Sequence, residues 1–451
     1  MGKDEWIIKH PVGCEAERNY LLRWLFGEVL GCRVVLIESE CAEHVISLRG
    51  NSKQLRVPDY FFQVAQKNWL SVESLTSIEK AFQQRLALPE LVESEKDSFV
   101  LDVDIFGILF VLLSRYEEAV SHEIDHHGRF EDRQSFMIQN ALSSRAIGNE
   151  LIEHLISSLA QIWNGFQRLE REFRVIPSHD IDRPSAFWQS SYRNRTKQAL
   201  ANLGKNRSLK TAGLLMREAV QLRRDSRLDL KGDPNDTIDW IIQVSESAGR
   251  QSTFYYIPVQ THGRFDAGMP LDHPLVERQW RSIQDAGHQL GVHPGYETYL
   301  DESQMRRSVE VFSKQREKMA AGGKALFSRQ HYLRWEASRT PSIMEEAGIT
   351  IDSTVGFPSQ AGFRAGICYE YPMYDLVNRR SLSLRQQPLI VMECSVIDDR
   401  YMGLGRTEEA MNLMMNLKEE CRKYLGDFTV LWHNQRFIDP REREMYRTLI
   451  S

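Results

Sequence analysis

Apolar and polar residues follow two different patterns along the chain, and the change falls near residue 170. In the first part, the spacing predicts a helix over Tyr20–Leu30, a β-rich run over Arg33–Ile37 and a helix over Ile147–Ile162. The second part is more regular, with short β-rich runs between stretches of helical spacing. We therefore expect a smaller mixed α/β domain in residues 1–170 and a second domain in residues 171–451.

The second part predicts a sheet of mainly parallel strands. Its β-rich runs are Val175–Asp182, Thr253–Pro258, Gln289–His293, Ala325–His331, Ile349–Thr354, Leu389–Cys394 and Phe428–His433. The stretches of helical spacing are Thr237–Ala248, His273–Ala286, Glu302–Ala321 and Glu408–Tyr424. Strands that alternate with helices form parallel sheets or barrels, and a barrel of this kind takes ~250 residues. The expected fold class is therefore α/β, with a (β/α) barrel.

Composition argues against two classes of protein. Hydrophobic residues make up 42% and charged residues 26% of the 451 residues, which is enough apolar surface to build cores and speaks against disorder. The net charge of −5 differs from that of most nucleic-acid-binding domains, so no nucleic-acid partner is expected. Locally, Arg193–Lys231 holds eleven Lys or Arg and three Asp or Glu. This segment predicts a solvated helical insertion or, alternatively, a surface that faces an anionic polymer or lipid.

Neither export nor a membrane span is predicted. The first ten residues lack the apolar core of a signal peptide. The longest apolar run, Ile105–Leu113, has nine residues, whereas ~20 are needed to cross a bilayer. We therefore expect a cytoplasmic protein without a transmembrane segment. The six cysteines include no Cys-x-x-Cys pair, which speaks against a thiolate zinc site.

Residues that can bind metals stand at the ends of several β-rich runs. S-H-D-I-D ends at Asp182, G-V-H at His293 and S-R-Q-H at His331, while L-W-H-N contains His433. The carboxyl ends of parallel strands meet on one face of a barrel, where active sites lie. Asp180 and Asp182 share a strand face, and two close carboxylates are stable together when a divalent cation lies beside them. Alternatively, the pair only begins a turn. Zinc suits such ligands, as would cobalt, nickel or iron.

Taken in order, these motifs resemble those of NodB-type polysaccharide deacetylases. The matching segments are H-D-I-D-R-P, G-H-Q-L-G-V-H-P, R-Q-H-Y-L-R and L-W-H-N, between about Arg174 and Phe437, with G-F-R-A-G-I-C and D-S-T as further similarities. The stretch D-V-D-I-F-G-I-L-F-V-L-L-S-R-Y-E-E resembles an uncharacterised domain that precedes such deacetylase domains in bacterial proteins. The resemblance implies a distorted (β/α) barrel that hydrolyses acetyl groups on a sugar with the help of a divalent metal, Zn²⁺ being the ion expected.

The resemblance also implies a role for each matched residue. The implied catalytic residues are Asp180 as the base, Arg329 as the group that holds the base, and His433 as the general acid. The implied metal ligands are Asp182 and His293. The backbone N–H of Tyr332 would face the oxyanion.

One position departs from the family pattern. The second motif of the family is usually H-x-x-x-H, but the residue four after His293 is Glu297. The missing ligand is either His331, at an expected strand end, or Glu297, whose carboxylate is an acceptable donor for zinc. A third outcome is a degenerate site, which would make the chain a non-catalytic glycan-binding relative.

The substrate expected from this reasoning is an acetylated sugar or glycan precursor inside the cell. Tyr296 and Trp335 follow predicted loop entries and are candidates to stack on a sugar ring, with core packing as the alternative. Another metal-assisted hydrolase, acting on a cyclic amide or a phosphate ester, is the other enzymatic alternative.

The N-terminal part has no chemistry of its own in the sequence. We expect it to pack on the barrel or to shape a substrate cleft. Arg115, Glu117 and Glu118 are expected to form surface or interdomain ion pairs, and His126–Arg129 to be a loop rather than a metal site.

Overall fold

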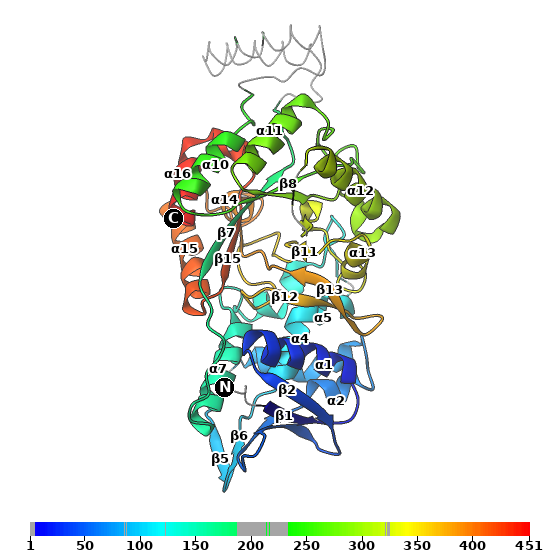
Figure 1. Ribbon diagram of the computed structural model, residues 1–451, viewed down its shortest axis with the longest axis vertical. Coiled ribbons are helices and arrows are strands. Elements are labelled where there is room, and N and C mark those ends of the chain that lie inside the picture. Colours follow the sequence, from blue (N-terminus) through cyan, green and yellow to red (C-terminus); the bar gives the residue numbers. More distant parts are fainter. Residues whose placement is uncertain are drawn as a thin grey trace.

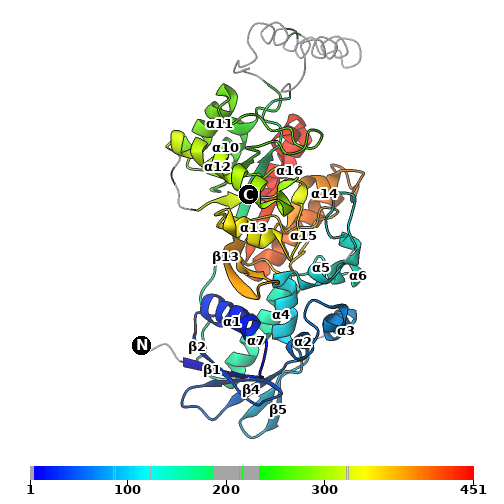
Figure 2. The ribbon, with the colours of Figure 1, turned by 90° about the vertical axis from the view of Figure 1, so that its right-hand side faces the viewer.

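Two β-sheets organise the chain in the computed structural model, which describes residues 5–84, 86, 88–121, 123–186, 213, 216, 233–320, 322 and 325–451. A six-stranded sheet lies at one end of the molecule, and a nine-stranded sheet fills the other half (Figures 1 and 2). The basic segment Arg193–Lys231 falls almost wholly outside the described residues.

The six-stranded sheet is built from the N-terminal part of the chain. Its order is β2-β1-β3-β4-β6-β5, with both parallel and antiparallel pairs. Its strands are β1 (Glu5–His10), β2 (Arg33–Glu38), β3 (Glu43–Leu48), β4 (Gln54–Pro58), β5 (Val92–Glu95) and β6 (Ser98–Val100). The helices of this part are α1 (Glu15–Leu22), α2 (Phe61–Ala65), α3 (Thr76–Gln83), α4 (Ile105–Ser114), α5 (Tyr116–Val120), α6 (Phe136–Gln139) and α7 (Ile147–Ile162).

The nine-stranded sheet has the order β12-β13-β11-β10-β9-β8-β7-β15-β14. Its strands are β7 (Arg174–Ile181), β8 (Thr253–Tyr256), β9 (Gln289–Val292), β10 (Phe327–Ser328), β11 (Ile351–Asp352), β12 (Tyr371–Asp375), β13 (Arg380–Gln386), β14 (Val391–Met392) and β15 (Asp427–Leu431). The helices around it are α10 (Ile238–Ser247), α11 (Pro274–Asp285), α12 (Glu302–Lys318), α13 (Thr340–Glu346), α14 (Glu393–Ile397), α15 (Glu408–Lys423) and α16 (Pro440–Ile450).

Every pairing in this sheet is parallel except that of β12 with β13. The expected mixed α/β class with a mainly parallel sheet is thus confirmed. The sheet's order begins at β12 and ends at β14, and these pairings do not show closure into a barrel, which stays a prediction. The division of the chain at residue 170 also stays a prediction, although the linker between α7 and β7 contains it.

Helix α4 lies between the two sheets. All ten of its residues are buried, because I-F-G-I-L-F-V-L-L-S is apolar on every face and the helix packs against α1, α7 and β12. Asp104 caps its N-terminus by accepting a hydrogen bond of 2.8 Å from the N–H of Gly107. The apolar run therefore serves as a buried helix that joins the two parts of the molecule.

A buried ion-pair cluster follows α4 and also joins the two parts. Arg364 donates two hydrogen bonds, of 2.8 and 2.9 Å, to Glu118, and Arg115 contacts both Glu118 and Glu117. None of the four side chains is more than 6% exposed. The pairs therefore lie between the parts of the molecule rather than on its surface.

No helix in the part of the chain that the structure describes combines the length and the apolar character that crossing a bilayer requires.

Candidate functional site

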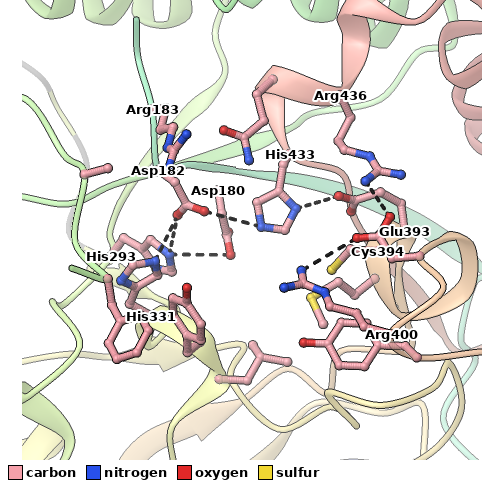
Figure 3. A pocket seen from close by; sticks show the side chains of 18 of the residues that line it. Asp180, Asp182, Arg183, His293, His331, Glu393, Cys394, Arg400, His433 and Arg436 are labelled. Carbon is pink, nitrogen blue, oxygen red and sulfur yellow. Dashed lines mark hydrogen bonds and ion pairs between the residues drawn. The ribbon is translucent and has the colours of Figure 1, made fainter. Parts of the chain in front are cut away.

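Strands of the nine-stranded sheet carry the candidate residues at or beyond their carboxyl ends. Asp180 is the second-last residue of β7, and Asp182 follows the strand directly. His293 follows β9, His331 lies three residues after β10, and His433 lies two residues after β15. Because these strands are close in the sheet order, their side chains meet at one edge of the sheet (Figure 3).

Asp182, His293 and His331 form a compact set. The Oδ1 atom of Asp182 lies 3.2 Å from Nε2 of His293 and 3.4 Å from Nε2 of His331. The three ligand atoms all lie within 4.8 Å of one another. Carboxylate oxygen and imidazole nitrogen are ligands that suit zinc and related divalent metals. Glu297 is not in this set, because its carboxylate binds Arg334 at 3.1 Å.

The histidines of the set are oriented through their Nδ1 atoms. Nδ1 of His293 donates a hydrogen bond to the carbonyl oxygen of Arg329. Nδ1 of His331 donates one of 2.7 Å to Asp266, whose carboxylate also accepts from three backbone N–H groups. With Nδ1 protonated, Nε2 of each ring carries the lone pair, and this atom faces Asp182. Such outer hydrogen bonds are typical of metal-binding histidines.

The Oδ1 atom of Asp182 supports a cation at this position. It is buried and has no hydrogen-bond partner among the residues that the structure describes. A buried carboxylate oxygen without a donor carries the full cost of its desolvation, ~1–3 kcal/mol or more for a charged group. A divalent cation between Asp182 and the two histidines would remove this cost, so the residues present fit a metal.

Charges around Asp182 favour its ionised form. Burial raises the pKa of Asp182, but His331, His293 and His433 outweigh it and hold the pKa well below the usual range. Burial likewise lowers the pKa of His293, whereas Asp180 and Asp182 raise it, and the net result is a raised pKa. Both shifts indicate that the site attracts positive charge.

Asp180 lies beside the set and is held by Arg329. Nη1 of Arg329 donates a hydrogen bond of 2.9 Å to Oδ1 of Asp180. The rest of the guanidinium is bound by Ser178 and Ser353, so its orientation is fixed. The other oxygen of Asp180 lies 3.6 Å from Nε2 of His293.

His433 lies on the far side of Asp182 and forms a pair with Glu393. Nδ1 of His433 donates a hydrogen bond of 2.6 Å to Glu393, and Nε2 lies 3.7 Å from Oδ2 of Asp182 (Figure 3). Burial lowers the pKa of His433, but the fully buried Glu393 and the aspartates raise it to about 10. The imidazole is therefore positively charged at neutral pH, with a proton on both nitrogens.

Tyr332 follows His331 in an unusual backbone conformation. Tyr332 has a φ of 62° and Leu333 a φ of 52°, so two consecutive non-glycine residues are left-handed. Such backbone is strained and persists only where its surroundings hold it. The carbonyl oxygen of Tyr332 accepts a hydrogen bond of 2.7 Å from Arg129, which belongs to the N-terminal part of the chain.

The turn Ile124–Phe130 brings Arg129 to this place. Its ends form an antiparallel bridge, and Asp125 binds the guanidinium of Arg129 at 2.7 Å. His127 of the same turn accepts or donates a hydrogen bond of 2.9 Å with the hydroxyl of Tyr296, and its carbonyl oxygen accepts one from Arg334. The N-terminal part thus contacts the loops that follow β9 and β10.

Two residues expected to stack on a sugar ring are not free to do so. Trp335 is 1% exposed and belongs to the hydrophobic core, which places it away from any substrate surface. Tyr296 is 5% exposed and is covered by Arg334, whose guanidinium lies 3.9 Å from the ring centre. Both side chains therefore support the loops around the site.

The candidate residues open into a pocket of about 310 Å³ (Figure 3). Six of the expected residues line it: Asp180, Asp182, His293, His331, Tyr332 and His433. Arg329 lies behind Asp180, and Glu297 lies outside the lining. The pocket also contains residues that the motifs do not identify, namely Arg129, Glu393, Arg400 and Arg436. Of these, Glu393 follows β14 directly, so its place at a strand end was a usable signal in the sequence.

Comparisons with known proteins give limited matches. A profile of a family of unknown function, DUF7033, matches residues 7–164, in agreement with the expected uncharacterised N-terminal domain. No curated protein matches the chain. A crystal structure of a candidate polysaccharide deacetylase from Mycobacterium smegmatis is similar, with 16% sequence identity, a TM-score of 0.39 and coverage of 62% of this chain and 83% of that chain.

Proposed function

We propose that the chain is a metal-dependent hydrolase that removes acetyl groups from a carbohydrate. The geometry around Asp182 carries the proposal, because two oriented histidines face one orphaned carboxylate oxygen. A zinc or similar divalent cation held by Asp182, His293 and His331 supplies Lewis acidity, which polarises a carbonyl group and eases the ionisation of water. The choice of an acetylated sugar rests on the resemblance of the four motifs to NodB-type deacetylases.

In this proposal Asp180 is the general base. Arg329 occupies its Oδ1 atom and fixes its orientation. Its Oδ2 atom is then the one that accepts the proton of the attacking water. A base positioned in this way contributes ~10²–10⁴-fold to the rate.

His433 is the general acid of the proposal. Glu393 holds its Nδ1 and keeps the ring protonated, and Nε2 faces the pocket beside Asp182. From Nε2 the proton passes to the leaving nitrogen or oxygen of the sugar. The backbone N–H of Tyr332 is assigned to the oxyanion.

A non-catalytic, glycan-binding relative is the less supported alternative. The glycan-binding alternative assumes that the site lacks a second histidine to bind the metal. His331 lies 3.4 Å from Asp182 and can take that role. Intact acid and base pairs at Asp180 and His433 also favour an enzyme.

Release of acetate tests the proposal. Purified chain loaded with zinc is incubated with N- and O-acetylated oligosaccharides, and free acetate is measured. We expect release by the wild type, a loss of ~100-fold or more in kcat for Asp180→Asn, and normal release by Glu297→Gln, the matched carboxylate outside the site. Folded, metal-loaded wild type that releases no acetate from any of these sugars would overturn the proposal.

A further inference from the structure

The wall of the pocket that faces the Asp182 set contains arginines that the proposed reaction does not use. Arg400 projects into the pocket from the segment after α14, across from Asp180 and Asp182 (Figure 3). Arg436 also lines the pocket, and both arginines pair with Asp398. Neither residue binds Asp182 or the histidines in any described contact.

Arg400 is the pocket end of a chain of alternating charges. In this series of ion pairs, each charged group lies 2.5 to 3.6 Å from the next, in the order Arg400, Asp398, Arg436, Glu442, Arg406, Asp439 and Arg441. Four guanidinium groups therefore share three carboxylates. Asp398 already binds Arg436 at 2.6 Å, whereas Arg400 is 3.6 Å away, so Arg400 holds the uncompensated charge.

Two further observations mark this wall as a place for an anion. The Nη2 atom of Arg436 is buried and has no hydrogen-bond partner among the described residues. Arg400 is 65% exposed while its guanidinium lies 4.8 Å from the ring centre of Tyr401, which also lines the pocket. A buried polar atom without a partner often marks the place of an unseen ligand, and a guanidinium fork matches carboxylate and phosphate.

The other acids that line the pocket are Asp180, Asp182 and Glu393. Asp180 is bound to Arg329, Asp182 belongs to the candidate metal set, and Glu393 is bound to His433 while its charge also acts on Arg436. Arg183 also lines the pocket but lies beside Asp182, away from Arg400 (Figure 3). After these pairings, the wall around Arg400 keeps a net positive charge.

We propose that the pocket selects a sugar that carries an anionic group, a carboxylate or a phosphate, which Arg400 binds. This inference rests on the proposed function for the identity of the sugar. The anionic group lies on the side of the pocket away from the Asp182 set, so that charge pairing orients the acetyl group toward Asp180 and His433.

Binding of matched sugars tests the inference without any turnover. The probes for calorimetry are N-acetylglucosamine, its 1-phosphate, and N-acetylmuramic acid, which adds a carboxylate. We expect at least one anionic probe to bind the wild type 10-fold or more tightly than the neutral sugar, and Arg400→Gln to abolish this preference. Arg307→Gln, an exposed arginine on α12, is the control and should keep it.

Each outcome separates the two proposals. A preference for the phosphate or for the carboxylate identifies the source of the anion. An equal affinity of the wild type for all three sugars, or a preference that survives in Arg400→Gln, overturns the inference. If the preference is found but no acetate is released, the anion subsite stands and the proposed hydrolysis falls.

Discussion

His331 is held through its Nδ1 atom by a carboxylate that comes from another loop. Asp266 accepts this hydrogen bond at 2.7 Å and is itself fixed by N–H groups of Thr261, His262 and Tyr296. Burial raises the pKa of Asp266, but His331 and these donors lower it to about 2, so the carboxylate is ionised at neutral pH. An ionised acceptor at Nδ1 makes Nε2 a stronger metal ligand.

We therefore predict that Asp266→Asn weakens zinc binding. Loss of an outer partner of a metal-bound histidine costs ~10–100-fold in affinity. The measurement is competition for zinc against a chromogenic chelator, with Glu297→Gln as the control. An Asp266→Asn affinity equal to that of the control would show that His331 needs no such partner, or is not a ligand.

At the residue scale, the sequence identifies the candidate ligands better than the residues that orient them. Asp182, His293 and His331 stand at strand ends, where parallel topology brings them together whatever the loops do. Asp266 and Arg129 reach the site from irregular segments whose path no periodic pattern encodes. For Trp335 the sequence left open stacking on a sugar ring or core packing, and the loop after β10 turns its ring into the core.

Two short elements from different parts of the chain meet beside the pocket. The turn Ile124–Phe130 presents Arg129, and the loop after β10 presents the left-handed Tyr332 and Leu333. The hydrogen bond from Arg129 to Tyr332 holds this strained backbone. The N-terminal part thereby shapes the pocket as well as packing on the sheet.

Arg129→Ala is predicted to lower kcat by about 10–100-fold with a smaller change in KM. Without the donor, the backbone of Tyr332 relaxes, and small misplacements near reacting groups cost this much in rate. Arg129→Lys should recover part of the loss. The kinetics are measured with the acetylated sugar that the wild type hydrolyses.

A nearby arginine, Arg133, provides the control for Arg129→Ala. Arg133 is 82% exposed and, among the residues that the structure describes, pairs with Glu131 alone, so Arg133→Ala should leave kcat and KM unchanged. If Arg129→Ala matches this control, Arg129 does not position Tyr332.

At the scale of elements, each β-rich run predicted from the sequence overlaps a strand of the structure, and the predicted helices of the second part are present. The predicted helix Ile147–Ile162 agrees with α7, and the predicted helices in the second part agree to within a few residues. The predicted helix Tyr20–Leu30 is instead α1 followed by a π-helix over Arg23–Val29. The β12–β13 hairpin was not foreseen, although β13, R-S-L-S-L-R-Q, alternates polar and apolar residues and its burial alternates with them.

For the whole molecule, the buried cluster of Arg115, Glu117, Glu118 and Arg364 links the two sheets. Burial raises the pKa of Glu118, but Arg364 and Arg115 outweigh it and lower the pKa below its usual 4.5. A lowered pKa in the folded state means that this carboxylate stabilises the fold above about pH 4.5. That stability is lost as the pH falls through the folded-state pKa. Burial raises the pKa of Glu117, so its ionisation lowers the stability of the fold as the pH rises.

We predict that Glu118→Gln lowers the free energy of unfolding by about 3 kcal/mol at pH 7, because it leaves two buried arginines short of charge. The difference between wild type and variant should shrink on acidification to pH 4 and below, which isolates Glu118 from Glu117. Urea unfolding at several pH values measures this difference in the free energy of unfolding. Glu302→Gln, which removes an exposed pair with Arg306, is the control and should change stability by less than about 0.5 kcal/mol. A pH-independent difference would contradict the assignment.

The central claim is that Asp182, His293 and His331 hold one divalent cation, and metal content tests it most directly. The wild type and variants are loaded with zinc, desalted and analysed for zinc per chain. We expect about one ion for the wild type and for Glu297→Gln, and close to none for Asp182→Asn and for His331→Ala. A wild type that retains no zinc, or an Asp182→Asn variant that retains as much as the wild type, would contradict it.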